Sequence, residues 1–136
     1  MAAPVLVSNC IRVQVLIVDD SPLVRTRLAE LVAEVENVTV AGESATVADA
    51  LTELARLQPD FVILDIAMPD GNGITVLEAA KQLEHAPLVG MLTHYPSPQF
   101  RKRCLEAGAD FFWDKGRDLA EILAVLRALA GRGAGS

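Results

Sequence analysis

Four short runs of apolar residues recur along the chain, and each ends in a polar residue. The runs are VQVLIVDD (13–20), FVILD (61–65), PLVGMLT (87–93) and DFFWDK (110–115). Nearly continuous apolar runs that are rich in β-branched or aromatic residues are typical of strands covered on both faces, as in a parallel sheet. A fifth run, VTVAGES (38–44), is less apolar, and we expect it to form an edge strand.

Helical patterns fill the segments between these runs. In residues 22–35, apolar side chains recur at helical spacing and fall on one face. The same pattern predicts helices over 46–57 and 74–83. A fourth helix is expected from Pro98 until Gly108, and a fifth begins at Asp118.

Three of the predicted helices have clear start signals. Ser21 and Ser97 each precede a proline, which combines an N-cap hydroxyl with a first-turn residue that needs no N–H. Asp118, followed by Glu121 three positions later, resembles a capping box, in which both side chains satisfy backbone N–H groups at the helix start.

The elements alternate between strand and helix five times. Parallel strands joined through helices require right-handed crossovers and place helices on both faces of the sheet. The sequence therefore predicts an α/β fold with a doubly wound, five-stranded parallel sheet of flavodoxin-like architecture. We expect one domain over 13–130, with an N-terminal lead over 1–12 and a flexible tail over 131–136.

Composition narrows the range of functions. The net charge of −6 argues against a general nucleic-acid binder, because phosphate contacts need clustered cations. No apolar stretch is long enough to cross a bilayer, and the N-terminus lacks the basic region of a signal peptide. Cys10 and Cys104 are too few for a disulfide framework or a metal motif. We therefore expect a cytoplasmic protein that contacts neither membrane nor nucleic acid.

Polar side chains follow four of the predicted strands. The first strand ends in Asp19 and Asp20, the third in Asp65, the fourth in Thr93 and the fifth in Lys115. In an open parallel sheet, ligands bind beyond the carboxyl ends of the strands. These side chains should therefore converge at one edge of the sheet.

Three carboxylates in one pocket repel each other. At 4 Å, one such pair costs about 1 kcal/mol in water and about 4 kcal/mol at an effective dielectric constant near 20. A proton or a cation must relieve this repulsion, and oxygen ligands suit a hard ion such as Mg²⁺. A carboxylate can also attack a phosphoryl group, whose charge a metal ion, a lysine and a hydroxyl would share.

The motifs LIVDD, LDIAMPDGNG, MLT and FFWDK, in this order, resemble the receiver domain of two-component response regulators, in its single-domain, chemotaxis-type form. The resemblance covers about 13–130. It implies that Asp65 accepts the phosphoryl group and that Mg²⁺ is the cofactor. Asp20 would bind the ion directly, Asp19 would hold a metal-bound water, and the carbonyl of Ala67 would complete the protein ligands.

The same resemblance assigns roles to the remaining strand ends. It implies that the Thr93 hydroxyl turns towards the phosphoryl group and that Lys115 pairs with it. Phe112 would be the aromatic residue whose rotamer follows Thr93. A sensor histidine kinase or a phosphotransfer protein would donate the group. The surface of the fourth helix, fifth strand and fifth helix would report the change to a downstream protein. The oligomeric state stays open, and a phosphorylation-dependent dimer is one option.

Three positions depart from the commonest pattern of such domains. Gly116 stands where many have a proline, which leaves the isomer of the Lys115–Gly116 bond open. His94 and Tyr95 follow Thr93, where small residues are usual. Our hypothesis is that they crowd attacking water and prolong the phosphorylated state, although an imidazole that positions water would do the opposite. Ala67 offers no side chain to orient water.

Several functions remain in competition at this stage. The chain is either a stand-alone signalling module that catalyses only its own phosphorylation and dephosphorylation, or the receiver part of a longer DNA-binding transcriptional regulator. An aspartate-dependent phosphatase would need a second acid where Ala67 stands. Flavin binding is disfavoured because DDSPLV places two negative charges where a phosphate would lie. A receiver without phosphorylation is disfavoured by the complete acidic set.

Overall fold

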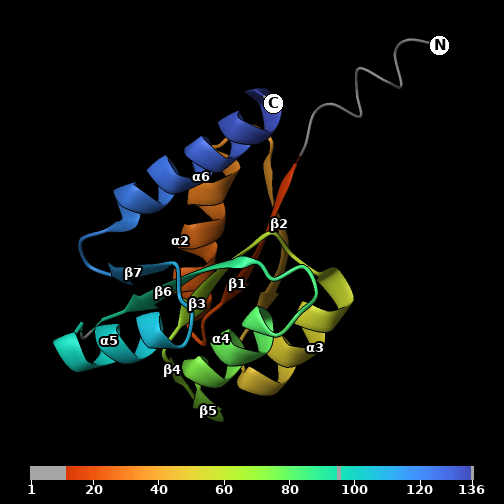
Figure 1. The fold of residues 1–136 in the computed structure, drawn as a ribbon. Helices are drawn as coiled ribbons and strands as arrows, with labels where there is room; N and C mark the ends of the chain where they lie inside the picture. Colours follow the sequence, from red (N-terminus) through yellow and green to blue (C-terminus); the bar gives the residue numbers. More distant parts are fainter. Residues whose placement is uncertain (1–11, 95, 136) are drawn as a thin grey trace.

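The computed structural model describes residues 12–94 and 96–135. A five-stranded sheet with parallel pairing throughout lies at its centre, in the order β2-β1-β3-β6-β7 (Figure 1). The predicted doubly wound α/β fold is therefore confirmed, with the weakest predicted strand at an edge. The strands of this sheet are β1 (Val13–Val18), β2 (Val38–Ser44), β3 (Phe61–Asp65), β6 (Leu88–Thr93) and β7 (Phe111–Asp114).

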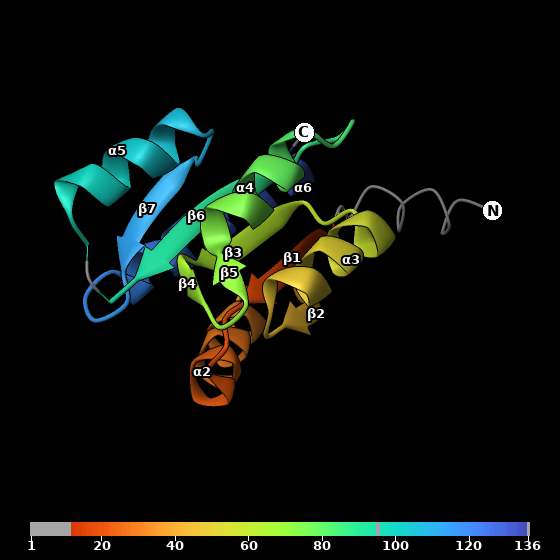
Figure 2. The same ribbon diagram turned by 90° about the horizontal axis from the view of Figure 1, so that it is seen from below.

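Helices cover both faces of the sheet. Figure 2 shows α2 on one side, while α3, α4 and α5 lie on the other. Buried residues of α2 and α6 share one core cluster with one face of the sheet, and buried residues of α3, α4 and α5 share a second cluster with the opposite face. The helices are α2 (Pro22–Ala33), α3 (Val47–Leu57), α4 (Gly73–Lys81), α5 (Pro98–Glu106) and α6 (Leu119–Gly135).

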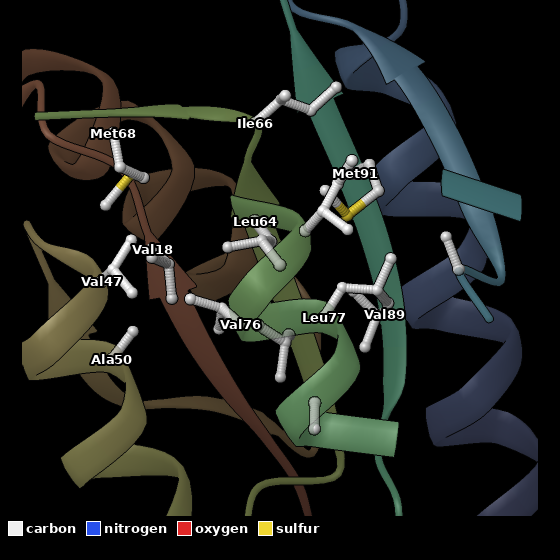
Figure 3. Packing of buried hydrophobic residues seen from close by; sticks show 14 of the residues in the cluster. Val18, Val47, Ala50, Leu64, Ile66, Met68, Val76, Leu77, Val89 and Met91 are labelled. Atoms are coloured by element: carbon white, nitrogen blue, oxygen red, sulfur yellow. The ribbon is translucent and has the colours of Figure 1, made fainter. Parts of the chain in front are cut away.

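The two clusters explain why the central strands read as continuous apolar runs. In β3 every residue is buried, because alternate side chains enter the two cores. Figure 3 shows the cluster on the side of α3 and α4, where Leu64 and Met91 of the sheet meet Val76 and Leu77. Burial on both faces holds β3 rigidly and fixes the point at which its last residue leaves the core.

Both Ser-Pro start signals operate as predicted. The Ser21 hydroxyl accepts the Val24 N–H at 3.3 Å, and the Ser97 hydroxyl accepts the Phe100 N–H at 3.1 Å. These hydrogen bonds satisfy N–H groups that a helix start leaves free.

The predicted capping box at the start of α6 is wrong. The Asp118 carboxylate accepts the backbone N–H of Asp114 at 2.9 Å, and the Glu121 carboxylate accepts the indole N–H of Trp113. Trp113 is buried, and its indole N–H needs a hydrogen-bond partner. The Glu121 carboxylate accepts this N–H and is therefore not used to cap the start of α6.

The C-terminal boundary also differs from the prediction. The segment 131–136 was expected to be a flexible tail, but α6 continues to Gly135. Extending an existing helix fixes one residue for each new hydrogen bond, so glycines weaken the last turns without ending them. The N-terminal lead predicted over 1–12 lies outside the described residues except for residue 12. Among the described residues, no helix has the length and apolarity that a membrane span requires.

A small hairpin that the sequence did not predict follows β3. Its strands, β4 (Ala67–Met68) and β5 (Gly71–Asn72), pair in antiparallel fashion. The Asp70 carboxylate in its turn accepts the N–H groups of Val47 and Ala48 at 2.7 and 3.1 Å. These hydrogen bonds lower the pKa of Asp70 and fasten the segment after Asp65 to the start of α3.

Gly90 provides a test of the packing between β6 and β7. A Cβ on Gly90 would overlap the ring of Trp113. We expect Gly90→Ala to lower the free energy of unfolding by about 1–3 kcal/mol, the usual effect of overpacking a core. Gly131→Ala is the matched control, because a Cβ there meets nothing within 4 Å; it should stabilise α6 by up to about 1 kcal/mol. Urea denaturation measures both, and equal effects of the two substitutions would contradict this packing.

Candidate metal centre

Three carboxylates meet at the carboxyl edge of the sheet. Asp19 and Asp20 follow β1, and Asp65 is the last residue of the adjacent strand β3. One oxygen from each of the three lies within 4.8 Å of the other two. Asp19 and Asp65 are 1% and 6% exposed, whereas Asp20 is exposed. The group is therefore a buried acidic pair with a third acid on the solvent side.

Lys115 is the cation that faces this group. Its Nζ lies 2.6 Å from Asp19 Oδ2 and 3.1 Å from Asp65 Oδ2. The contact with Asp19 is an ion pair without good hydrogen-bond angles, since that buried oxygen has no hydrogen-bond partner. The backbone N–H of Lys115 donates to the carbonyl of Thr93 at 2.8 Å. This bond fixes Lys115 beyond the end of β6, where it reaches both acids.

Burial and like charge dominate the electrostatics of the site. The pKa of Asp65 is raised, first by burial and then by the charge of Asp19, while Lys115 and the Ala67 N–H oppose the rise. Burial alone would lower the pKa of Lys115, but its close contacts with the carboxylates of Asp19 and Asp65 outweigh this effect, so the pKa of Lys115 is raised. One ammonium group thus offsets only part of the negative charge.

Backbone groups hold the two buried acids in place. The Ser21 N–H donates to Asp19 Oδ1 at 2.9 Å, and the Ala67 N–H donates to Asp65 Oδ1 at 3.2 Å. Gly73 allows the start of α4 to approach the end of β3, because a Cβ there would overlap the carbonyl oxygen of Asp65. Its N–H donates to the carbonyl of Ile66 at 2.7 Å.

The acidic group fits a hard divalent cation. Mg²⁺ binds six oxygens at about 2.1 Å, so two of its ligand oxygens lie at most about 4.2 Å apart. The spacing within 4.8 Å needs only small side-chain rotations to reach this geometry. The donors are all oxygen atoms, which excludes the soft-ligand sets of zinc and copper sites.

The remaining predicted residues lie around the same edge of the sheet. Thr93 is buried at the end of β6, and Ala67 is exposed in β4 beside Asp65. Phe112 is half-buried in β7, packs against the core on the side of α3 and α4, and lines a hollow between α5 and the loop before α6. His94 is exposed and lines a second hollow, together with Lys115.

The structure answers one of two open points from the sequence, the isomer of the Lys115–Gly116 bond, and leaves the role of Tyr95 untested. The described residues contain no cis peptide bond, so the Lys115–Gly116 bond is trans. Tyr95, which we expected to act together with His94, lies outside the described residues.

Two residues at the site were missed by the sequence reasoning. Gly73 could have been suspected from the motif GNG, which follows a strand and opens a helix. Arg25 was not assigned to this site from the sequence, yet its Nη1 donates to the carbonyl of Asp19 at 2.6 Å. Its partner Glu43 is distant in the sequence, and this contact exists only in the folded chain.

Comparisons with known proteins agree on one family. The model of the response regulator receiver domain matches residues 15–127. A candidate transcriptional regulator of Pseudomonas aeruginosa is 40% identical over 116 residues, which are 85% of this chain and 56% of that protein. The response regulator GacA of Pseudomonas viridiflava is 35% identical over 118 residues, which are 85% of this chain and 54% of GacA. The chain thus spans about half the length of these curated relatives.

Solved structures show the same similarity in three dimensions. A LuxR-family two-component response regulator from Aurantimonas is 26% identical with a TM-score of 0.80, covering 89% of this chain and 86% of that chain. A chain from the CheX-CheY-BeF3-Mg²⁺ complex of Borrelia burgdorferi is 30% identical with a TM-score of 0.79, covering 88% of this chain and 90% of that one.

The repulsion at this site predicts that Asp65→Asn stabilises the fold. Without divalent cations at neutral pH, we expect the free energy of unfolding to rise by about 1 kcal/mol or more, because one of three like charges is removed. Asp49→Asn is the control, since Asp49 is exposed on α3 and does not belong to the acidic group. Its effect should stay within about 0.5 kcal/mol.

The pH dependence of this gain follows from the raised pKa of Asp65. A raised pKa means that the folded state holds the proton more tightly, so ionisation at higher pH lowers stability. As the pH falls through the pKa of Asp65, this carboxylate becomes neutral in the wild type. The gain in free energy of unfolding from Asp65→Asn should then shrink. Urea denaturation at several pH values measures this, and a variant less stable than the wild type at neutral pH would contradict the electrostatic account.

Proposed function

We propose that this chain accepts a phosphoryl group on Asp65. The chain belongs to the family of response regulator receiver domains of two-component systems. The donor would be a phosphohistidine of a sensor histidine kinase or of a phosphotransfer protein. The observation that carries this proposal is the contact of Asp19, Asp65 and Lys115 at the open edge of the sheet. In the proposed reaction Asp65 is the nucleophile, Asp19 helps to hold the metal and Lys115 is the cation, and their mutual contacts support a shared role at one phosphoryl group.

In the proposed transfer, a carboxylate oxygen of Asp65 attacks the phosphorus atom. The bond between phosphorus and the donor histidine nitrogen breaks, and the imidazole leaves with the electron pair of that bond. Lys115 then exchanges its contact with Asp65 for a phosphoryl oxygen, while Asp19 keeps it in place. The Thr93 hydroxyl is the donor proposed for a second phosphoryl oxygen.

The carboxylates of Asp19, Asp20 and Asp65, with the carbonyl of Ala67, are the groups proposed to hold Mg²⁺. When bound, Mg²⁺ neutralises charge on the acids and on the transferred group. The fit of the three carboxylate oxygens to an octahedral ion supports this assignment. A similar receiver complex from Borrelia burgdorferi contains both BeF3 and Mg²⁺.

We place the output on the surface formed by α5, β7 and α6. Phe112 lines a hollow on this surface, together with Arg101 of α5 and Arg117 of the loop before α6. Phe112 lies in β7, and Lys115 follows the end of this strand. A shift of Lys115 towards a phosphoryl group would therefore move the backbone close to Phe112. A downstream protein would recognise the change there, and a phosphorylation-dependent dimer is one form that such recognition takes.

The proposal describes a cytoplasmic signalling module that turns over no released substrate. It catalyses only its own phosphorylation and dephosphorylation, and neither nucleic acid nor membrane is bound through this chain. The alternative is the receiver part of a longer DNA-binding regulator. The candidate transcriptional regulator of Pseudomonas aeruginosa supports this second reading, since the match covers 56% of that protein. Both readings share the chemistry at Asp65.

Intact mass spectrometry tests the chemistry. We expect one added phosphoryl group after incubation with Mg²⁺ and a small phosphodonor such as acetyl phosphate. Asp65→Asn should show no adduct, and Asp49→Asn should react as the wild type does. Removing Mg²⁺ with a chelator should suppress the reaction. An adduct that persists in Asp65→Asn, or its absence from the wild type, would exclude Asp65 as the acceptor.

The lifetime of the phosphorylated state tests the role of His94. Its ring is exposed and lines the hollow that Lys115 also lines, beside the proposed phosphorylation site. We expect His94→Ala to accelerate loss of the phosphoryl group severalfold, because attacking water gains access. His85→Ala is the control, since His85 is exposed beyond the end of α4. A rate that stays the same or falls in His94→Ala would refute the crowding hypothesis.

A further inference from the structure

Arg25 of α2 connects the acidic site to the edge strand β2. Its Nε lies 3.2 Å from Glu43 Oε1, and its Nη1 donates to the backbone carbonyl of Asp19 at 2.6 Å. The Arg25 side chain is only 18% exposed, and its contact with the Asp19 carbonyl is partly buried, whereas its contact with Glu43 is open to solvent. The guanidinium group therefore joins the end of β2 to the peptide that links Asp19 and Asp20.

This peptide has little other support. The N–H of Asp19 bonds to the carbonyl of Ser44, but from the Asp19 carbonyl onward the chain is neither strand nor helix until α2 begins. The Asp19 side chain is fixed by Ser21 and Lys115. Asp20 is exposed, and no hydrogen bond of its side chain is found among the described residues. The direction of the Asp20 carboxylate is therefore set by its backbone.

A register shift makes Glu43 available to Arg25. Along β1 and β2, Val15 is opposite Val40, but Leu16 is opposite Gly42, so one residue of β2 is skipped. A shift of one residue moves a side chain to the other face of a sheet. Glu43 thereby comes opposite Ile17, on the face that α2 covers.

We propose that Arg25 is a positioning residue for the proposed Mg²⁺ ligands. By bridging the Asp19 carbonyl and the Glu43 carboxylate, it would fix the direction in which the Asp20 carboxylate faces the metal. This inference rests on the proposed function, because it assumes that these acids bind Mg²⁺.

Charge and positioning predict opposite effects of removing Arg25. A cation near the site repels Mg²⁺, so charge alone predicts tighter binding in Arg25→Met and weaker binding in Glu43→Ala. Positioning predicts weaker Mg²⁺ binding in both variants. Arg25→Met removes the hydrogen bond to the Asp19 carbonyl, and Glu43→Ala removes the acceptor that holds Arg25 in place. The sign of the change in Arg25→Met therefore separates the two explanations.

The experiment measures the Mg²⁺ dissociation constant of the whole chain by calorimetric titration. The rise of the unfolding midpoint with Mg²⁺ concentration gives an independent value. We expect Arg25→Met and Glu43→Ala to raise the dissociation constant roughly tenfold, which corresponds to about 1.4 kcal/mol. Arg27→Met is the matched control, since Arg27 is exposed on the same helix without a hydrogen bond to this site. It should bind Mg²⁺ as well as the wild type or slightly better.

Two conservative variants separate positioning from general stability. Gln at position 43 can still accept from Arg25, so Glu43→Gln should bind nearly as the wild type does. In Arg25→Lys the charge is kept, but one ammonium group cannot replace the planar fork of the guanidinium at both partners, so binding should stay weakened. This variant also serves if Arg25→Met fails to fold.

Each outcome decides the proposal. Unchanged or tighter Mg²⁺ binding in Arg25→Met, or full recovery in Arg25→Lys, would overturn it while leaving the proposed function intact. Lower stability without any change in Mg²⁺ affinity would show a purely structural role and would also overturn it. A wild type that does not respond to Mg²⁺ would refute the inference and the metal dependence of the proposed function together.

Discussion

The repulsion between carboxylates at the end of the sheet is the constraint on which the site depends. Parallel strands end at the same edge, so the acids that follow β1 and the acid that ends β3 are brought within 4.8 Å of one another whatever their charge. Lys115 contacts Asp19 and Asp65, and its ammonium offsets part of their charge. Burial of both strands fixes the backbone that carries these acids, so the excess negative charge stays concentrated at this edge, where a cation can bind.

The local backbone is built to keep this unfavourable arrangement. Ser21 and Ala67 donate N–H groups to the buried carboxylates, and Gly73 brings the start of α4 against the carbonyl of Asp65. The two N–H groups bind the Oδ1 atoms of Asp19 and Asp65. The oxygens that remain free of backbone contacts are those that face Lys115 and solvent. Stability of the surrounding core thus supports a site that is itself electrostatically strained.

Sequence patterns predicted those features that follow from burial and from topology. The bounds of β3 matched the run FVILD, because a strand buried on both faces is apolar at every position. The convergence of the strand-end acids followed from parallel order alone. Contacts between distant side chains were not predictable: Glu121 pairs with Trp113 in place of a helix cap, and Arg25 reaches Glu43 only after a register shift. The two strands of the hairpin after β3 have two residues each, which is too short to show an alternation of apolar and polar residues in the sequence.

Lys115 also limits how the site can signal. Its ammonium now contacts Asp19 and Asp65, and in the proposed reaction a phosphoryl oxygen competes for the same group. A ligand shifts a conformational equilibrium only by the difference between its contacts in the two states. Because Lys115 is bonded through its N–H to Thr93 and follows β7 directly, any change of partner acts on β6 and β7 together. Phe112 lies on β7 and lines the hollow between α5 and the loop before α6, so the proposed exchange of partners would reach that hollow through β7.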